Sequence, residues 1–154
     1  MKKQVLTILA LMAFIPTFAQ FTTGTVTLTT GFSIKIDTDA TKVTLTLIGP
    51  SNTWLGIGFG GTSMSSVNDM FIWNSSSNRD YTPSGGQSTP SPDAVQSWTI
   101  VSDDAPSSTR TIVATRPLDS SNDFTFLNSS ASISIIYALS NTQNFGEHNG
   151  NHSS

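Results

Sequence analysis

The sequence predicts an all-β fold, an antiparallel β-sandwich of the immunoglobulin-like type in one domain. Three observations predict it. Apolar and polar residues alternate in short runs rich in β-branched side chains. Clusters of Pro, Asp, Asn and Ser separate these runs, as at residues 50–52, 103–106 and 119–122. The chain shows no internal repeat, coiled-coil heptad or domain linker, and its length suits a single core.

The strands are expected in a regular order along the chain. They cover residues 21–30, 32–37, 42–49, 54–60, 69–74, 97–102, 110–116, 123–127 and 132–140. The longest irregular stretch, residues 75–96, is rich in Ser, Pro and Gly. It is interpreted as a solvated connector, with a functional loop as the alternative. Short strands separated by turn residues are typical of a sandwich.

The first 19 residues have the pattern of a secretory signal peptide. Lys2 and Lys3 precede an apolar stretch over residues 5–14, and residues 17–19 give the small-x-small end of a cleavage site. We expect cleavage between Ala19 and Gln20, leaving one domain over residues 20–154 in a secreted, extracellular or periplasmic protein. The apolar run is short for a membrane span, although an uncleaved anchor is the alternative, and no second stretch approaches that length.

Charge and cysteine content exclude several classes of partner and cofactor. The seven Lys and Arg against ten Asp and Glu give a formal net charge of −3, and loss of Lys2 and Lys3 makes it about −5. Without a basic stripe to displace counterions from phosphate, a nucleic-acid partner is not expected. The absence of cysteine excludes disulfides, iron–sulfur clusters, thiolate zinc sites and covalent c-type haem.

Two side chains give the polar β-sequence a candidate chemistry. Met64 lies in a loop after a glycine-rich strand, and His148 lies near the far end of the chain. A thioether and an imidazole can hold a haem iron from opposite faces. Met70 and His152 are the competing ligands; Met70 is expected to be core and His152 part of a frayed tail. A surface zinc or copper site of Glu147, His148 and His152 is a further alternative.

The glycines of the strand at residues 54–60 alternate with large apolar residues. If Ile57 and Phe59 point to the core, the glycines at 56, 58 and 60 leave the opposite face flat, so that a planar ligand or another backbone can approach. A neighbouring loop over the strand, or a bulge, is the competing interpretation. A dinucleotide-binding motif is excluded because no amphipathic helix follows the glycines.

Four segments, in this order, resemble the DOMON domain family, and especially its haem-binding branch. They are W-x-G-I-G-F from Trp54, the Met64 loop followed by DMFIW at 69–73, TRPLDSSND at 115–123, and IIYAL followed by F-x-x-H ending at His148. That branch includes the cytochrome domains of cellobiose dehydrogenase type and plant ascorbate-reducible b-type cytochromes. The likeness covers most of residues 20–154.

The resemblance implies a β-sandwich with non-covalent haem b in a pocket at one end. Transferred by position, the iron ligands are Met64 and His148. Arg116 and Asp123 are expected to fix a turn through hydrogen bonds rather than touch a ligand. Six apolar residues are candidates for packing the porphyrin: Trp54, Phe59, Met70, Trp73, Tyr137 and Phe145.

The leading functional hypothesis is one-electron transfer between a redox partner protein or small-molecule reductant and the haem. The alternative from the same family is a carbohydrate-binding module without haem, with Trp54, Trp73, Trp98 and Tyr81 as stacking rings; a cell-surface interaction domain is the third hypothesis. The protein is not expected to be an enzyme. Glu147 is the one glutamate and the other acids lie mostly in turn-like settings, so a glycosidase pair such as Asp69 with Asp123 would be an arbitrary choice. No Gly-x-Ser-x-Gly elbow is present. The acidic pair Asp37 and Asp39 is read equally as a calcium ligand pair or as a turn.

Overall fold

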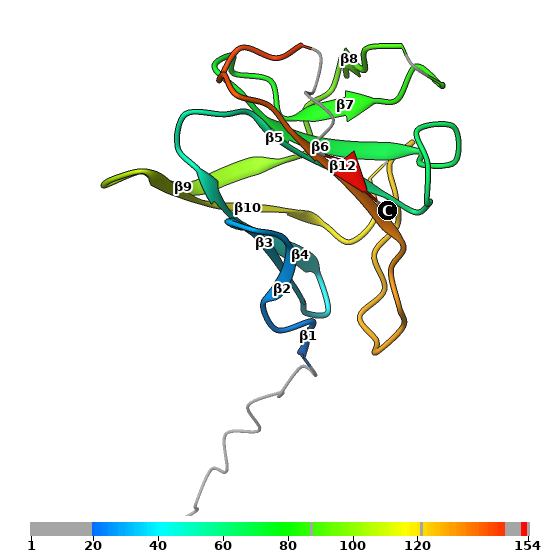
Figure 1. Ribbon diagram of the computed structural model, residues 1–154. Coiled ribbons are helices and arrows are strands. Elements are labelled where there is room, and N and C mark those ends of the chain that lie inside the picture. The colour runs from blue at the N-terminus through cyan, green and yellow to red at the C-terminus, as the bar shows by residue number, and fades with distance from the viewer. Residues whose placement is uncertain (1–19, 87, 121, 147–151, 154) are drawn as a thin grey trace, which may run out of the picture.

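The computed structural model describes residues 20–86, 88–120, 122–146 and 152–153 of the 154-residue chain. The expected signal peptide and His148 lie outside the described residues. Within them the fold is two antiparallel sheets that form a sandwich, with no helix (Figure 1). The described residues contain no helix with the length and hydropathy of a membrane span. The predicted all-β sandwich is therefore confirmed.

The first sheet has the strand order β1-β3-β4-β10-β9, with β2 paired to β3. Its strands are β1 (Phe21–Thr22), β2 (Val26–Thr29), β3 (Phe32–Thr38), β4 (Lys42–Pro50), β9 (Thr99–Asp104) and β10 (Thr109–Pro117). The second sheet has the order β12-β11-β5-β6-β7-β8. Its strands are β5 (Leu55–Phe59), β6 (Asp69–Trp73), β7 (Asp80–Thr82), β8 (Ser91–Pro92), β11 (Ile135–Leu139) and β12 (His152–Ser153).

The two sheets differ in how their faces are buried. In β3 and β4 buried and half-buried residues alternate strictly, because one face meets the core and the other meets water. In β5 and β6 every residue is buried. A strand buried on both faces must be covered outside the sandwich as well, so the second sheet carries a second packed layer on its outer face.

The core lies between the sheets. Its largest fully buried side chains include Phe32 and Leu45 from the first sheet, and Phe59 and Phe71 from the second. Trp98, just before β9, stacks with Phe59 at a centroid distance of 6.2 Å. One ion pair crosses this core: Nη2 of Arg116, on β10, lies 2.6 Å from Oδ2 of Asp69, on β6.

Four expectations about elements were wrong. The expected strand over residues 21–30 is divided into β1 and β2. Residues 123–127 form no strand, and the stretch 75–96 contains β7 and β8 rather than an unstructured connector. The backbone of His152 is not a frayed tail, since β12 pairs His152 with Ala138 of β11. The turn interpretation of Asp39 is supported, because its Oδ1 accepts hydrogen bonds from the backbone N–H groups of Thr41 and Lys42 at 2.8 and 2.9 Å.

Candidate functional site: an apolar cluster on the outer face of the second sheet

The outer face of the second sheet is built from residues that alternate with the core residues of the same strands. The register places Ile136, Gly58, Met70 and Tyr81 in one row across β11, β5, β6 and β7. The next row consists of Ala138, Gly56 and Ile72. Ile57 and Phe59 of β5 point to the core, as expected from the sequence.

Side chains from this face and from nearby loops form what we call the outer apolar cluster. Its buried members are Trp54, Met70, Ile72 and Tyr81, and the half-buried residues packed against them are Met64, Ala138 and Phe145. The ring of Phe145 lies 5.3 Å from that of Trp54 and 5.2 Å from that of Tyr81. The cluster is thus an aromatic surface outside the sandwich core.

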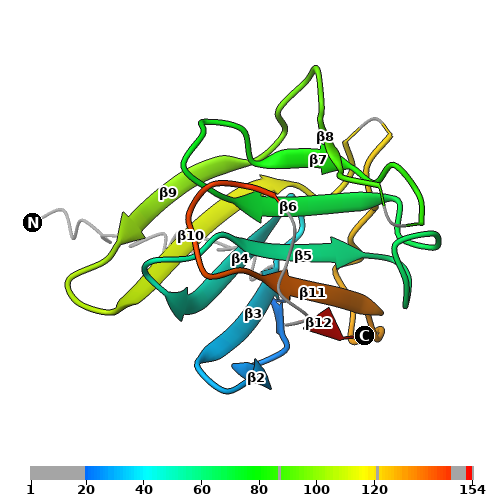
Figure 2. The same ribbon diagram turned by 45° about the horizontal axis from the view of Figure 1, so that its top comes forward.

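The chain after β11 crosses this face, as Figure 2 shows for the red segment that passes over β5 and β6. Backbone hydrogen bonds hold it there. The N–H of Trp54 donates to the carbonyl of Thr142 at 2.7 Å, and the N–H of Ser75 donates to the carbonyl of Gln143 at 2.9 Å. Phe145 is therefore positioned by the fold, three residues before the predicted ligand His148.

The Met64 loop reaches the same cluster from the end of β5. Gly60 leaves the strand with φ +84°, a left-handed conformation that favours glycine. A Cβ at Gly61 would lie 2.5 Å from the backbone carbon of Ser66, so the loop closes on itself there. Ser66 Oγ accepts hydrogen bonds from the N–H groups of Thr62 and Ser63, both at 3.0 Å. This tight turn carries Met64 to the edge of the outer apolar cluster.

The flat glycine face expected from the sequence is covered. A Cβ on Gly58 would lie 2.9 Å from Cγ1 of Ile136 and 3.2 Å from Cγ1 of Val67, and one on Gly56 would lie 3.1 Å from Cζ3 of Trp54. Gly60 belongs to the turn rather than to this face. The glycines therefore let neighbouring side chains approach the strand closely.

The structure divides the predicted site residues between the two faces of the sheet. Trp54, Met64, Met70 and Phe145 meet in the outer apolar cluster. Phe59, Trp73 and Tyr137 pack in or against the core between the sheets instead. The sheet itself separates the two groups, so a single planar ligand cannot contact both.

Ile72 and Ala138 were missed as site residues. Ile72 follows Met70 by two positions on β6, so period-two alternation places both on one face. Ala138 is placed on the same face only by the pairing of β11 with β5. Neither pairing nor register can be read from one sequence, whereas the alternation on β6 could have been used.

One polar atom in the cluster lacks a partner. Trp54 is 3 % exposed, and no described residue lies within hydrogen-bonding distance of its indole N–H. A buried N–H donor without an acceptor is costly in a folded protein. It is a free donor within an otherwise apolar surface.

A polar hollow of ≈ 860 Å³ lies elsewhere, beside β1, β3 and β4. Lys35, Asp37, Asp39, Lys42 and several threonines line it, and none of the residues predicted to bind haem does. Its charged lining does not suit a large apolar ligand. We therefore treat the outer apolar cluster as the candidate site.

The described residues form a two-layer antiparallel sandwich with an additional covered face on its second sheet. The model of the DOMON domain family matches residues 27–140, most of the chain from β2 to just past β11. The chain therefore belongs to the DOMON family. No curated protein and no solved structure matches it.

Proposed function

We propose that this DOMON domain binds haem b at the outer apolar cluster and carries one electron between redox partners. The observation that carries the proposal is the meeting of three features on one face: the Met64 thioether, an aromatic surface, and the segment that leads to His148. These segments are far apart in the sequence. The fold brings Met64 and Phe145 to one cluster.

The residues present fit such a cofactor. A thioether is a ligand for haem iron in electron-transfer proteins, and Trp54, Met70, Tyr81 and Phe145 offer the apolar and aromatic contacts a porphyrin needs. The unpartnered indole N–H of Trp54 is a donor for the polar edge of such a group. When bound, haem would supply the iron that changes oxidation state by one electron.

Each part of the chain has a distinct task in this proposal. Met64 and His148 would hold the iron together, and a thioether with an imidazole is a ligand pair typical of electron transfer rather than catalysis. Phe145 and Trp54 would exclude water, and burial of this kind tunes the potential. A redox protein or a small-molecule reductant would exchange the electron at an exposed edge, in the extracellular or periplasmic space to which residues 1–19 would direct the chain.

The alternative, sugar binding through stacked rings, has less support from the described residues. Trp54, Trp73, Trp98 and Tyr81 are each 5 % exposed or less. A pyranose stacks on an open aromatic face, which these four rings lack, and a porphyrin would likewise have to displace the residues that cover the cluster. The Met64 thioether beside the rings is what favours haem over a sugar.

The test is a visible absorption spectrum of the purified protein after exposure to haem, recorded oxidised and then reduced. We expect a six-coordinate reduced spectrum that is lost or shifted in Met64→Leu and in His148→Ala. His152→Ala is the matched control and should leave it unchanged, while Met70→Leu alters only a contact to the porphyrin and should keep the six-coordinate form. A folded protein that stays colourless would refute haem binding, and loss of the six-coordinate form in Met70→Leu or His152→Ala would reassign the ligands.

A further inference from the structure

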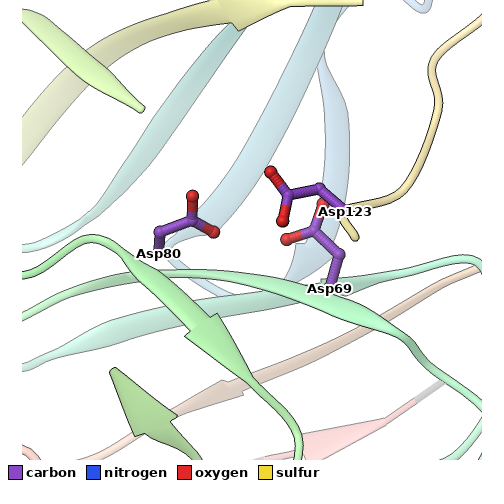
Figure 3. Close-up of side chains that lie close together, drawn as sticks. All are labelled: Asp69, Asp80 and Asp123. Atoms are coloured by element: carbon purple, nitrogen blue, oxygen red, sulfur yellow. The ribbon is translucent and has the colours of Figure 1, made fainter. Parts of the chain in front are cut away.

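Three aspartates converge inside the sandwich, on the opposite side of the second sheet from the outer apolar cluster. Asp69 begins β6, Asp80 begins β7, and Asp123 lies in the loop after β10. Figure 3 shows their carboxylates directed toward a common space. One carboxylate oxygen of each lies within 4.8 Å of the other two. Asp69 and Asp80 are only 1 % and 0 % exposed.

The hydrogen bonds of this cluster leave two buried oxygens unused. Oδ2 of Asp69 accepts from Nη2 of Arg116 at 2.6 Å and from the N–H of Phe124 at 3.1 Å. Oδ2 of Asp80 accepts from the N–H and the hydroxyl of Ser97. No described residue donates to Oδ1 of Asp69 or to Oδ1 of Asp80. Buried carboxylate oxygens without a donor are strongly unfavourable unless a cation is nearby.

The charges of the cluster are not balanced by the protein. Arg116 pairs with Asp69 and lies 4.0 Å from Oδ2 of Asp123, and it is the one cation among the described ion pairs of the cluster. When all three carboxyls are ionised, the single guanidinium leaves two negative charges uncompensated. Asp80 pairs with no described cation, and the negative charge of Asp93 acts on it as well.

The contacts of the Ser97 hydroxyl point to the same shortage of positive charge. Its Oγ contacts both Oδ2 of Asp80 and, at 2.6 Å, Oδ2 of Asp123. A hydroxyl has one proton, so it can donate to only one of the two carboxylates. The other contact brings together two oxygens that need either a protonated carboxyl or a nearby cation to be favourable.

We propose that Asp69, Asp80 and Asp123 form a binding site for one Ca²⁺ ion. The ligands would be one carboxylate oxygen from each residue. Ca²⁺ takes oxygen ligands at about 2.3–2.6 Å, so two oxygens on the same ion lie up to about 5 Å apart, which the cluster satisfies. A divalent ion also neutralises the two uncompensated charges. The site is independent of haem.

Calcium titration of the purified protein, after treatment with a chelator, tests the proposal. We expect calorimetry to show one site per chain with a Kd on the order of 1 mM or tighter, as in extracellular calcium modules. About 10 mM CaCl₂ should raise the melting temperature by about 5 °C or more. Asp80→Asn should abolish both effects, and the exposed control Asp104→Asn should retain them. If Asp80→Asn does not fold, Asp123→Asn takes its place.

Terbium luminescence locates the ion without disturbing its ligands. Trp98 follows Ser97 directly, and its ring lies 5.0 Å from the guanidinium carbon of Arg116. Trp54 is on the other face of the sheet. Terbium emission excited through tryptophan should fall in Trp98→Phe far more than in Trp54→Phe. Absence of calcium binding at 10 mM, binding that survives Asp80→Asn, or emission that depends on Trp54 would each overturn the proposal.

Discussion

The single side chain of Arg116 connects the two sheets. Beyond its ion pair with Asp69, its Nη2 donates to the carbonyl of Phe124 at 2.6 Å and its Nη1 to Oγ of Ser120 at 3.0 Å. The guanidinium lies 4.8 Å from the ring centroid of Phe126. Arg116 thus fixes the turn after β10, as the sequence predicted for this residue.

Replacing Arg116 by methionine should destabilise the protein strongly. The substitution removes the one charge that compensates Asp69, whose side chain is 0 % exposed. Breaking a buried pair from one side costs about 3–5 kcal/mol of unfolding free energy. Lys35→Met is the matched control, because Lys35 pairs with Asp37 at the surface and should contribute about 0–1 kcal/mol. Equal urea midpoints for the two variants would contradict the role of Arg116.

The stability of the calcium-free protein should fall as the pH rises from about 4 to 7. Burial raises the pKa of Asp69 from its ordinary value of 3.8 to about 7, with Arg116 opposing and Asp80 and Asp123 adding to the shift. The folded state therefore binds more protons than the unfolded state in this range, so the contribution of Asp69 to stability is fully present below about pH 4 and is lost as the pH rises through about 7.

Urea unfolding in chelator at several pH values measures this dependence. Asp80→Asn should reduce the slope, because it removes both a negative neighbour of Asp69 and a second carboxyl whose pKa burial raises. Asp104→Asn, at an exposed position of β9, should leave the slope unchanged. A wild-type protein whose stability increases between pH 4 and 7 would show that the cluster is fully ionised when folded.

At the scale of elements, β5 depends on the absence of side chains on its outer face. Gly58→Ala would place a Cβ 2.9 Å from Cγ1 of Ile136 and should cost about 1–3 kcal/mol through overpacking. Gly146→Ala is the control, since a Cβ there meets nothing within 4 Å. Thermal melting of both variants checks the prediction, and a Gly58→Ala protein as stable as wild type would mean that Ile136 and Val67 can move aside.

The sequence predicts the strands whose pattern is set by alternation of apolar and polar residues. The prediction fails where side chains make hydrogen bonds with the backbone groups that a strand would pair. β3, β4 and β10 follow the predicted runs within one residue. Residues 123–127 alternate equally well, yet the N–H of Phe124 donates to Asp69 and its carbonyl accepts from Arg116. These contacts remove the groups that a strand ladder would need. Only the tertiary fold supplies them.

The candidate site could be predicted in part for the same reason. The four segments that resemble the DOMON family singled out Met64, Trp54, Met70 and Phe145, and these residues lie together. It also selected Phe59, Trp73 and Tyr137, whose rings pack toward the core. Separating the two groups needs the register of β5 with β6 and β11, which brings Trp73 and Tyr137 opposite the core residues Leu55 and Ile57.

At the scale of the whole molecule, the two sheets have different outer faces. The outer positions of β3 and β4 are half-buried polar residues such as Ser33, Thr44 and Thr46, so this face meets water. The outer face of β5 and β6 is covered by the Met64 loop and by the segment after β11. The described part of the domain therefore has three layers, namely the first sheet, the second sheet and this covering layer, and the proposed haem site lies in the covering layer.

The outermost layer should open without unfolding the domain. It is a small cluster attached by a few backbone hydrogen bonds, two of them from the N–H groups of Trp54 and Ser75, whereas β4 is paired on both sides by β3 and β10. Hydrogen exchange should thus be faster at Trp54 and Ser75 than in β4. Phe145→Ala should accelerate those two amides further, by about 10-fold or more, because it removes the ring that anchors the segment. Leu127→Ala, at a side chain 61 % exposed, should change neither. If Phe145→Ala accelerates β4 to the same extent, the outer layer and the core unfold together.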